Sequence, residues 1–241
     1  MLPGMSSNGS SLTPGSSRVA LVVGANRGIG LALSRRLAAR GRRVIAAGRR
    51  SSPELDAEKS RGVQVETGVD VTDAPSVDEL ARRMKDTSID ELVCCAGILR
   101  HDELDELDGN LDSVRAQIEV NAIGPLRVVR ALRGRLRRGS KVALITSRMG
   151  SIGDNSSGGS YGYRMSKAAL NAAGVSLARD LADAGVAVAI LHPGFVRTEM
   201  TRGQGNVDPE TAAAQLVDRI DALTPATTGT FWHANGEVLP W

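Results

Sequence analysis

The chain is poor in aromatic residues, in cysteine and in long apolar runs. Aromatic residues make up only 2% of its 241 residues, so a core must be built from Ala, Val, Leu and Ile. The two cysteines, Cys94 and Cys95, are adjacent, and neighbours on a strand point to opposite faces, which disfavours a disulfide between them. The apolar runs fall well short of the roughly 20 residues of a membrane span. The composition therefore argues against a disulfide-stapled scaffold and against a helical membrane protein.

The charges are nearly balanced, with 30 basic and 27 acidic residues and a net charge of +3. Such a balance does not predict a nucleic-acid partner. Arginines do crowd residues 127–138, where an apolar side is supplied by Leu126, Val129, Leu132 and Leu136. An amphipathic helix with a solvated or subunit-bridging face explains this pattern, and nucleic-acid contact is the alternative.

Residues 1–17 are rich in Ser, Gly and Pro and contain no apolar core, so we expect a disordered tail and no secretory signal. A cytoplasmic protein is the expectation, with an organellar address left open. Residues 18–241 show no repeat and no internal boundary, which predicts a single domain.

Strand-length apolar runs alternate with longer amphipathic segments along this domain. We expect strands at Val19–Val23, Arg43–Ala47, Val63–Val69, Glu91–Cys95, Lys141–Thr146, Val186–Leu191 and Gly229–Trp232. The expected helices are Ile29–Ala39, Ser76–Met84, Leu111–Leu136 with a bend near Gly124, Tyr163–Leu181 and Pro209–Ala222. The alternation predicts an α/β fold, a doubly wound parallel sheet of Rossmann type with helices on both faces.

A Gly-rich turn joins the first strand to the first helix. Residues 22–30 read Val-Val-Gly-Ala-Asn-Arg-Gly-Ile-Gly, a G-x-x-x-G-x-G spacing. Glycine permits a tight turn and close approach of the backbone to a pyrophosphate, and the helix N-terminus offers free N–H groups. In this position the motif predicts a dinucleotide site, with an ordinary loop as the alternative. The candidate cofactor-binding residues in this turn are Gly24, Asn26, Arg27, Gly28, Ile29 and Gly30.

The residue that follows the second strand decides which ribose the site accepts. An acid there would bind a free 2′-hydroxyl, but the strand is followed by Gly48, Arg49 and Arg50. Guanidinium groups match phosphate geometry, and Arg27 adds a third. We therefore predict NADP(H) over NAD(H). The alternative is that these arginines are solvated loop charges.

Tyr163 stands four residues before Lys167, which places both side chains on one face of a helix. A free tyrosine has a pKa of about 10, and a nearby cation favours the phenolate and lowers that pKa. Ser147, sixteen residues upstream, offers a hydroxyl that can hydrogen-bond a substrate oxygen. Such i,i+4 pairs are common on helix surfaces, but together with the Gly-rich turn this one predicts general acid–base chemistry, in which Lys167 lowers the pKa of Tyr163.

With these motifs in order along the chain, the sequence resembles the short-chain dehydrogenase/reductase family. The run from Gly162 to Asn171 is similar to that of the C-factor and sniffer-type carbonyl reductases. The resemblance implies a catalytic set of Asn121, Ser147, Tyr163 and Lys167. It also implies cofactor contacts along the chain, with Asp70 and Val71 at the adenine, Ala96 and Gly97 beside the cofactor, and Pro193, Gly194, Val196 and Thr198 at the nicotinamide.

One departure from the family lies after the fourth strand, where Cys94 and Cys95 replace a usual Asn-Asn pair. We expect small core residues in a reducing compartment, with a redox or metal pair and an oxidation-sensitive Cys95 as alternatives. The resemblance implies an NADP(H)-dependent oxidoreductase acting on a small carbonyl or alcohol, without metal, nucleic acid or membrane. It implies a homodimer, with a monomer or tetramer left open. The second function class is a cofactor-binding regulatory protein on the same scaffold.

Overall fold

The computed structural model describes residues 17–241. The tail predicted for residues 1–17 therefore lies, apart from Ser17, outside the described residues. No helix in the described part of the chain has the length and apolar character that crossing a membrane requires.

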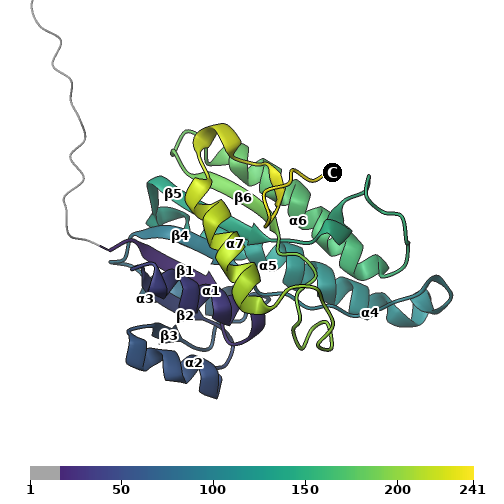
Figure 1. Ribbon diagram of the computed structural model, residues 1–241, viewed down its shortest axis with the longest axis horizontal. Helices are drawn as coiled ribbons and strands as arrows, with labels where there is room; N and C mark the ends of the chain where they lie inside the picture. Colours follow the sequence, from purple (N-terminus) through teal and green to yellow (C-terminus); the bar gives the residue numbers. More distant parts are fainter. Residues whose placement is uncertain (1–16) are drawn as a thin grey trace, which may run out of the picture.

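Within the described residues, one parallel sheet of seven strands forms the centre of the fold (Figure 1). Its strands are β1 (Val19–Val23), β2 (Arg43–Ala47), β3 (Gln64–Glu66), β4 (Ile89–Cys94), β5 (Leu136–Ile145), β6 (Ala187–His192) and β7 (Phe231–His233). Their order is β3-β2-β1-β4-β5-β6-β7, and every neighbouring pair is parallel. The chain reverses direction across the sheet after β3, so a crevice opens at the carboxyl ends of β1 and β4.

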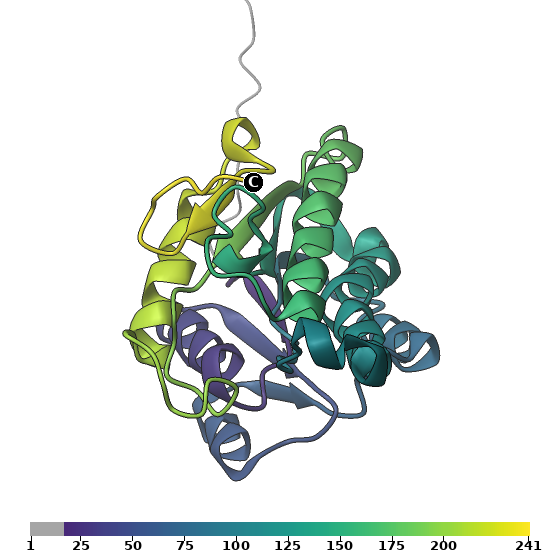
Figure 2. The same ribbon diagram turned by 90° about the vertical axis from the view of Figure 1, so that its right-hand side faces the viewer.

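Helices cover both faces of this sheet (Figure 2). One face packs against α1 (Gly28–Ala39) and α7 (Pro209–Ala222), and the other packs against α3 (Ala74–Arg83), α5 (Gly124–Leu132) and α6 (Tyr161–Asp180). Alternate residues of each strand enter the two cores. In β1, Ala20 and Val22 face the first core, and Leu21 and Val23 face the second. This two-faced burial explains the continuous apolar strands and confirms the predicted fold class.

The polar stretch after β2 contains a short helix that the sequence reading did not predict. Helix α2 (Pro53–Ala57) begins behind Ser52, whose side chain accepts a hydrogen bond from the Leu55 N–H at 3.1 Å. The Ser52 hydroxyl also donates to the Asn26 carbonyl at 2.7 Å, which ties this helix to the Gly-rich turn. Serine before proline is a helix-start signal that would have identified it.

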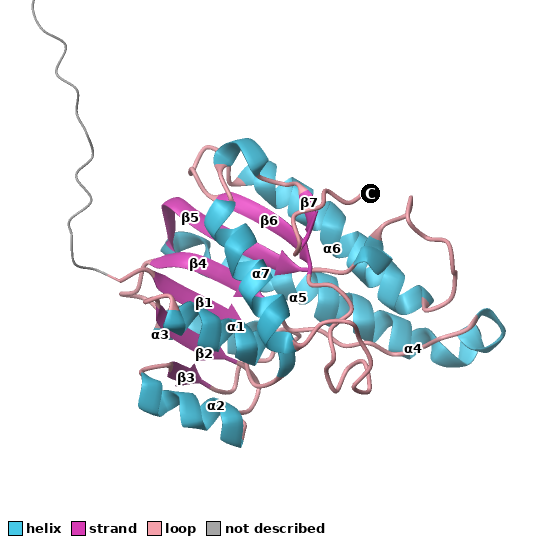
Figure 3. Ribbon diagram, viewed as in Figure 1, coloured by secondary structure: helices cyan, strands magenta, loops and turns pink. Residues whose placement is uncertain are grey.

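The segment Leu111–Leu136, predicted to be helical in one or two pieces, is divided into three. Helix α4 (Leu107–Ile118) is followed by a π-helical turn over Glu119–Ile123 and then by α5, so an interruption before Gly124 is confirmed (Figure 3). The predicted end at Leu136 is wrong, because Leu136 already pairs with Ile89 in the sheet. The predicted third strand is also too long, since Gly68 at φ 74° turns the chain out of the sheet.

Candidate active site

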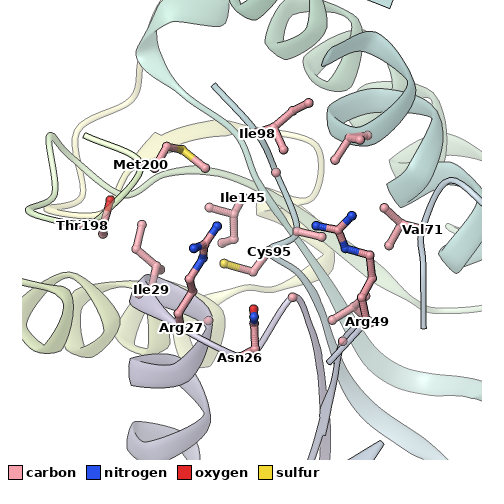
Figure 4. A pocket seen from close by; sticks show the side chains of 18 of the residues that line it. Asn26, Arg27, Ile29, Arg49, Val71, Cys95, Ile98, Ile145, Thr198 and Met200 are labelled. Atoms are coloured by element: carbon pink, nitrogen blue, oxygen red, sulfur yellow. The ribbon is translucent and has the colours of Figure 1, made fainter. Parts of the chain in front are cut away.

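A cavity of about 290 Å³ lies at the carboxyl ends of the strands, where the sheet order reverses (Figure 4). It brings together most of the predicted cofactor residues from six separate segments. Those that line it are Gly24, Asn26, Arg27, Gly28, Ile29, Gly30, Arg49, Asp70, Val71, Ala96, Gly97, Tyr163, Lys167, Pro193 and Thr198. The predicted residues Gly194 and Val196 line a neighbouring cavity instead.

The glycines of the turn sit where no other residue fits. A Cβ on Gly24 would lie 2.4 Å from the Ala96 nitrogen, and a Cβ on Gly30 would lie 2.1 Å from the Gly24 carbonyl oxygen. Gly28 has a φ of 53°, in the left-handed region, and opens helix α1. The bare backbone and the free N–H groups of the helix therefore face the cavity, a cradle that fits a pyrophosphate.

Two arginines enter this cavity from different loops, Arg27 from the Gly-rich turn after β1 and Arg49 from the loop after β2 (Figure 4). Arg27 forms an ion pair with Glu199, and the guanidinium of Arg49 lies 4.0 Å from the Asp70 carboxylate. Asp70 is ionised, because although burial opposes its charge, two hydrogen bonds from Thr72 hold its pKa below the usual value. Both arginines are more than half exposed and available to a phosphate, which fits a phosphorylated ribose.

A second cavity of about 370 Å³ shares a wall with the first. Tyr163 lines both, and Ser147 lines the second. Ser147 follows the end of β5, and Tyr163 lies in the first turn of α6. The Tyr163 phenol therefore lies between the first cavity, which fits a dinucleotide, and the second cavity.

The Tyr163–Lys167 pair has the predicted proximity but not the predicted pKa. The Lys167 ammonium lies 5.7 Å from the centre of the Tyr163 ring and donates to the Ile145 carbonyl at 3.0 Å. Burial raises the pKa of Tyr163 to about 12, although a hydrogen bond from Ser147 opposes the rise. Burial also lowers the pKa of Lys167 to about 8. The expectation that Lys167 lowers the pKa of Tyr163 is wrong, because desolvation of the phenol outweighs the opposing hydrogen bond with Ser147.

Asn121 lies in the π-helical turn and is fully buried. Its carbonyl oxygen accepts from the Ile98 N–H at 2.8 Å, and its amide donates to the Ile98 carbonyl and to the Ser166 hydroxyl, both at 2.9 Å. A Cβ on Gly97 would lie 3.2 Å from Asn121 Oδ1 and 3.7 Å from Lys167 Nζ, so these groups meet at the cavity. π-turns of this kind are frequent at functional sites.

Sequence reasoning missed several lining residues. Thr146, Glu199 and Met200 line the first cavity, and so does Cys95, the cysteine weighed above as an oxidation-sensitive site. Glu199 and Met200 directly follow the predicted nicotinamide segment, so their position next to Thr198 in the sequence could have identified them. Burial raises the pKa of the Cys95 thiol to about 12, which leaves little reactive thiolate and speaks against an oxidation-sensitive site.

Fold and cavities together define a dinucleotide-binding α/β protein with a buried tyrosine beside the cofactor space. A family model described as short chain dehydrogenase matches residues 18–208. The chain belongs to the short-chain dehydrogenase family, which confirms the resemblance read from the sequence.

Known relatives place the chain more closely within that family. It is 46% identical over 227 residues to the 1-hydroxy-2-glutathionyl-2-methyl-3-butene dehydrogenase of Rhodococcus sp. (strain AD45), covering 92% of this chain and 98% of that one. Carbonyl reductase Sniffer of D. melanogaster superposes with a TM-score of 0.86 at 25% identity, covering 94% of this chain and all of the other. A carbonyl reductase from Pseudomonas aeruginosa PAO1 in complex with NADP superposes at 0.80 with 34% identity, with coverage of 94% and 100%.

Proposed function

We propose that this oxidoreductase is NADP(H)-dependent and acts as a carbonyl reductase on a small carbonyl or alcohol substrate. The observation that carries the proposal is the place of Tyr163 on the wall between the two cavities, with Ser147 beside it. A proton donor there can serve a carbonyl in the second cavity that faces a nicotinamide in the first. The bound nicotinamide supplies or accepts the hydride.

The residues that would hold the cofactor follow from the cavity. The backbone of the Gly-rich turn binds the pyrophosphate, and Arg27 and Arg49 bind the 2′-phosphate. Asp70 and Val71 border the adenine, with Ala96 and Gly97 beside the cofactor. Pro193 and Thr198 hold the nicotinamide end within this cavity, and Gly194 and Val196 border it from the neighbouring one.

Proton transfer falls to the catalytic set. Tyr163 donates its phenolic proton to the carbonyl oxygen, and the Ser147 hydroxyl hydrogen-bonds the same oxygen. Lys167 stabilises the resulting phenolate with its ammonium and binds the ribose hydroxyls. Asn121 retains a second lone pair on Oδ1, which can accept from a water that links Lys167 to solvent.

For the substrate, the bacterial relative suggests a specific candidate. Its name describes an alcohol next to a glutathione thioether. We infer that oxidation of a glutathionyl alcohol is the second reaction to test, beside carbonyl reduction.

We further propose a cytoplasmic, single-domain homodimer that pairs through α5 and α6. An apolar hollow on these helices is bordered by Ile123, Leu126 and Leu177. Two of the three arginines at this hollow are paired with acids, Arg127 with Glu119 and Arg130 with Asp78. This pairing favours a solvated or subunit-bridging face over a nucleic-acid surface. The mass in solution, measured by light scattering, tests the dimer.

The proposal is tested by titrating the protein with NADPH and NADH, followed by a panel of aldehydes, ketones and quinones and by glutathionyl alcohols with NADP⁺. We expect tighter binding of NADPH and turnover of at least one substrate. Arg49→Ser is expected to weaken NADPH binding about tenfold or more with little change for NADH, since it removes a charge-assisted contact. NADPH binding without turnover would favour the regulatory alternative, and binding of neither cofactor would refute the proposal.

A further inference from the structure

The second cavity contains two arginines, each directly after a residue of the catalytic set. Arg148 follows Ser147, and Arg164 follows Tyr163. Their surroundings differ. Arg148 Nε lies 3.1 Å from the Asp154 carboxylate, and its Nη2 lies 2.9 Å from the Glu237 carboxylate. The charge of Arg148 is therefore matched within the protein.

Arg164 has no such partner. No carboxylate in residues 17–241 lies within 4.0 Å of its guanidinium, and residues 1–16 contain no acid. Its Nε donates to the Gly159 carbonyl at 3.0 Å, and its Nη2 donates to the Ser157 hydroxyl at 2.8 Å. These neutral acceptors hold the guanidinium in place, yet they leave both Nη1 hydrogens without a partner among the described residues.

The remaining walls of this cavity supply no unpaired anion for Arg164. Apolar side chains there are Leu99, Met149, Phe195 and Met200. The one carboxylate that lines this cavity, Asp154, is already paired with Arg148, and burial lowers the pKa of His192 to about 3, so His192 is neutral. A substrate in this space therefore meets the hydroxyls of Ser147 and Tyr163, an apolar surface, the Arg148–Asp154 ion pair and the unpaired guanidinium of Arg164.

We propose that the substrate carries a carboxylate, which Arg164 binds while the carbonyl lies against Tyr163 and Ser147. The inference rests on the proposed oxidoreductase function and narrows its substrates to anionic carbonyl compounds with an apolar middle. Guanidinium and carboxylate form short, charge-assisted hydrogen bonds, and Arg164 is already fixed by the loop it holds. Because Arg164 is the next residue after Tyr163 on α6, binding of the carboxylate also fixes the position of the reacting group.

The test compares ω-oxo carboxylic acids of increasing chain length with their methyl esters, which remove only the charge. Wild-type protein with NADPH is expected to show a higher kcat/KM for the acid at the fitting length. Arg164→Met is expected to lower kcat/KM for that acid about ten- to hundredfold while leaving its ester unchanged. Arg164→Lys keeps the charge and should retain part of the preference. Arg179→Met, on the exposed end of the same helix, should retain all of it.

Two results would overturn the inference while the proposed function stands. The first is equal kcat/KM for acid and ester in the wild type. The second is an equal loss of kcat/KM for acid and ester in Arg164→Met, which would mean that Arg164 only holds the loop of Ser157 and Gly159 in place. Absence of turnover with every substrate would instead refute the proposed function. In that case calorimetry with the corresponding alkanoic acids decides the inference, because binding must occur in the wild type and be lost in Arg164→Met.

Discussion

Arg27 and Glu199 form an ion pair between two segments that lie 172 residues apart in sequence. Arg27 belongs to the Gly-rich turn, and Glu199 belongs to the loop after β6; both line the cavity that fits the cofactor. Both side chains are largely exposed, so the attraction between them is screened by solvent. Glu199 therefore competes with the 2′-phosphate for the guanidinium of Arg27, to which we assign phosphate binding.

Glu199→Gln should free Arg27 and tighten NADPH binding. An exposed pair is worth at most about 1 kcal/mol, which corresponds to up to about fivefold in Kd. NADH lacks the 2′-phosphate and should change less. Glu210→Gln, a similarly exposed glutamate on α7, is the matched control. Fluorescence titration measures both cofactors, and unchanged or weaker NADPH binding would show that Glu199 does not compete for Arg27.

Asn121→Ala should destabilise the protein by about 3 kcal/mol, because three buried hydrogen bonds at about 1 kcal/mol each are lost. Urea denaturation measures the change. Asn110→Ala removes one exposed hydrogen bond and should cost much less. Equal losses in the two variants would mean that Asn121 does not hold the π-helical turn and the Ile98 segment together.

Lys167→Met should raise the free energy of unfolding, measured without added cofactor. The same substitution should abolish turnover. The pKa of Lys167 falls from 10.5 to about 8 on folding, so charging the buried amine opposes folding at neutral pH. That gain, less the lost bond to Ile145, amounts to roughly 2 kcal/mol. Lys85→Met, at an exposed lysine, should have no such effect.

The pH dependence of this difference has a definite sign. Below pH 8 Lys167 is charged in both states, and the full penalty is present. Between about pH 8 and 10.5 the unfolded chain binds more protons than the folded one, so wild-type stability gains with rising pH. The advantage of Lys167→Met measured by urea at pH 7 should therefore shrink at pH 10. A constant advantage would contradict the assigned pKa.

Local chemistry made the fold and the core of the site predictable. Continuous apolar strands indicated a sheet buried on both faces, and the Gly-rich turn indicated the cofactor cavity. The i,i+4 spacing placed Tyr163 and Lys167 together. Each of these signals is contained within a few neighbouring residues.

Features set by tertiary contacts were not predictable. The pKa of Tyr163 depends on the whole surrounding core, which desolvates the phenol more than the hydrogen bond with Ser147 stabilises its anion. The Arg27–Glu199 pair joins distant segments with no shared pattern. The start of β5 at Leu136 follows from its pairing with Ile89, and not from the helical periodicity that precedes it.

Turnover in Tyr163→Phe, measured beside Tyr161→Phe, tests the central claim most directly. The chain has two tyrosines, both in the first turn of α6, and Tyr161 lines neither cavity. We predict that Tyr163→Phe lowers kcat about a hundredfold or more with NADPH binding intact, since it removes the proton donor. Tyr161→Phe should turn over like the wild type. Full turnover in Tyr163→Phe would contradict the assignment of Tyr163 as the acid between the two cavities.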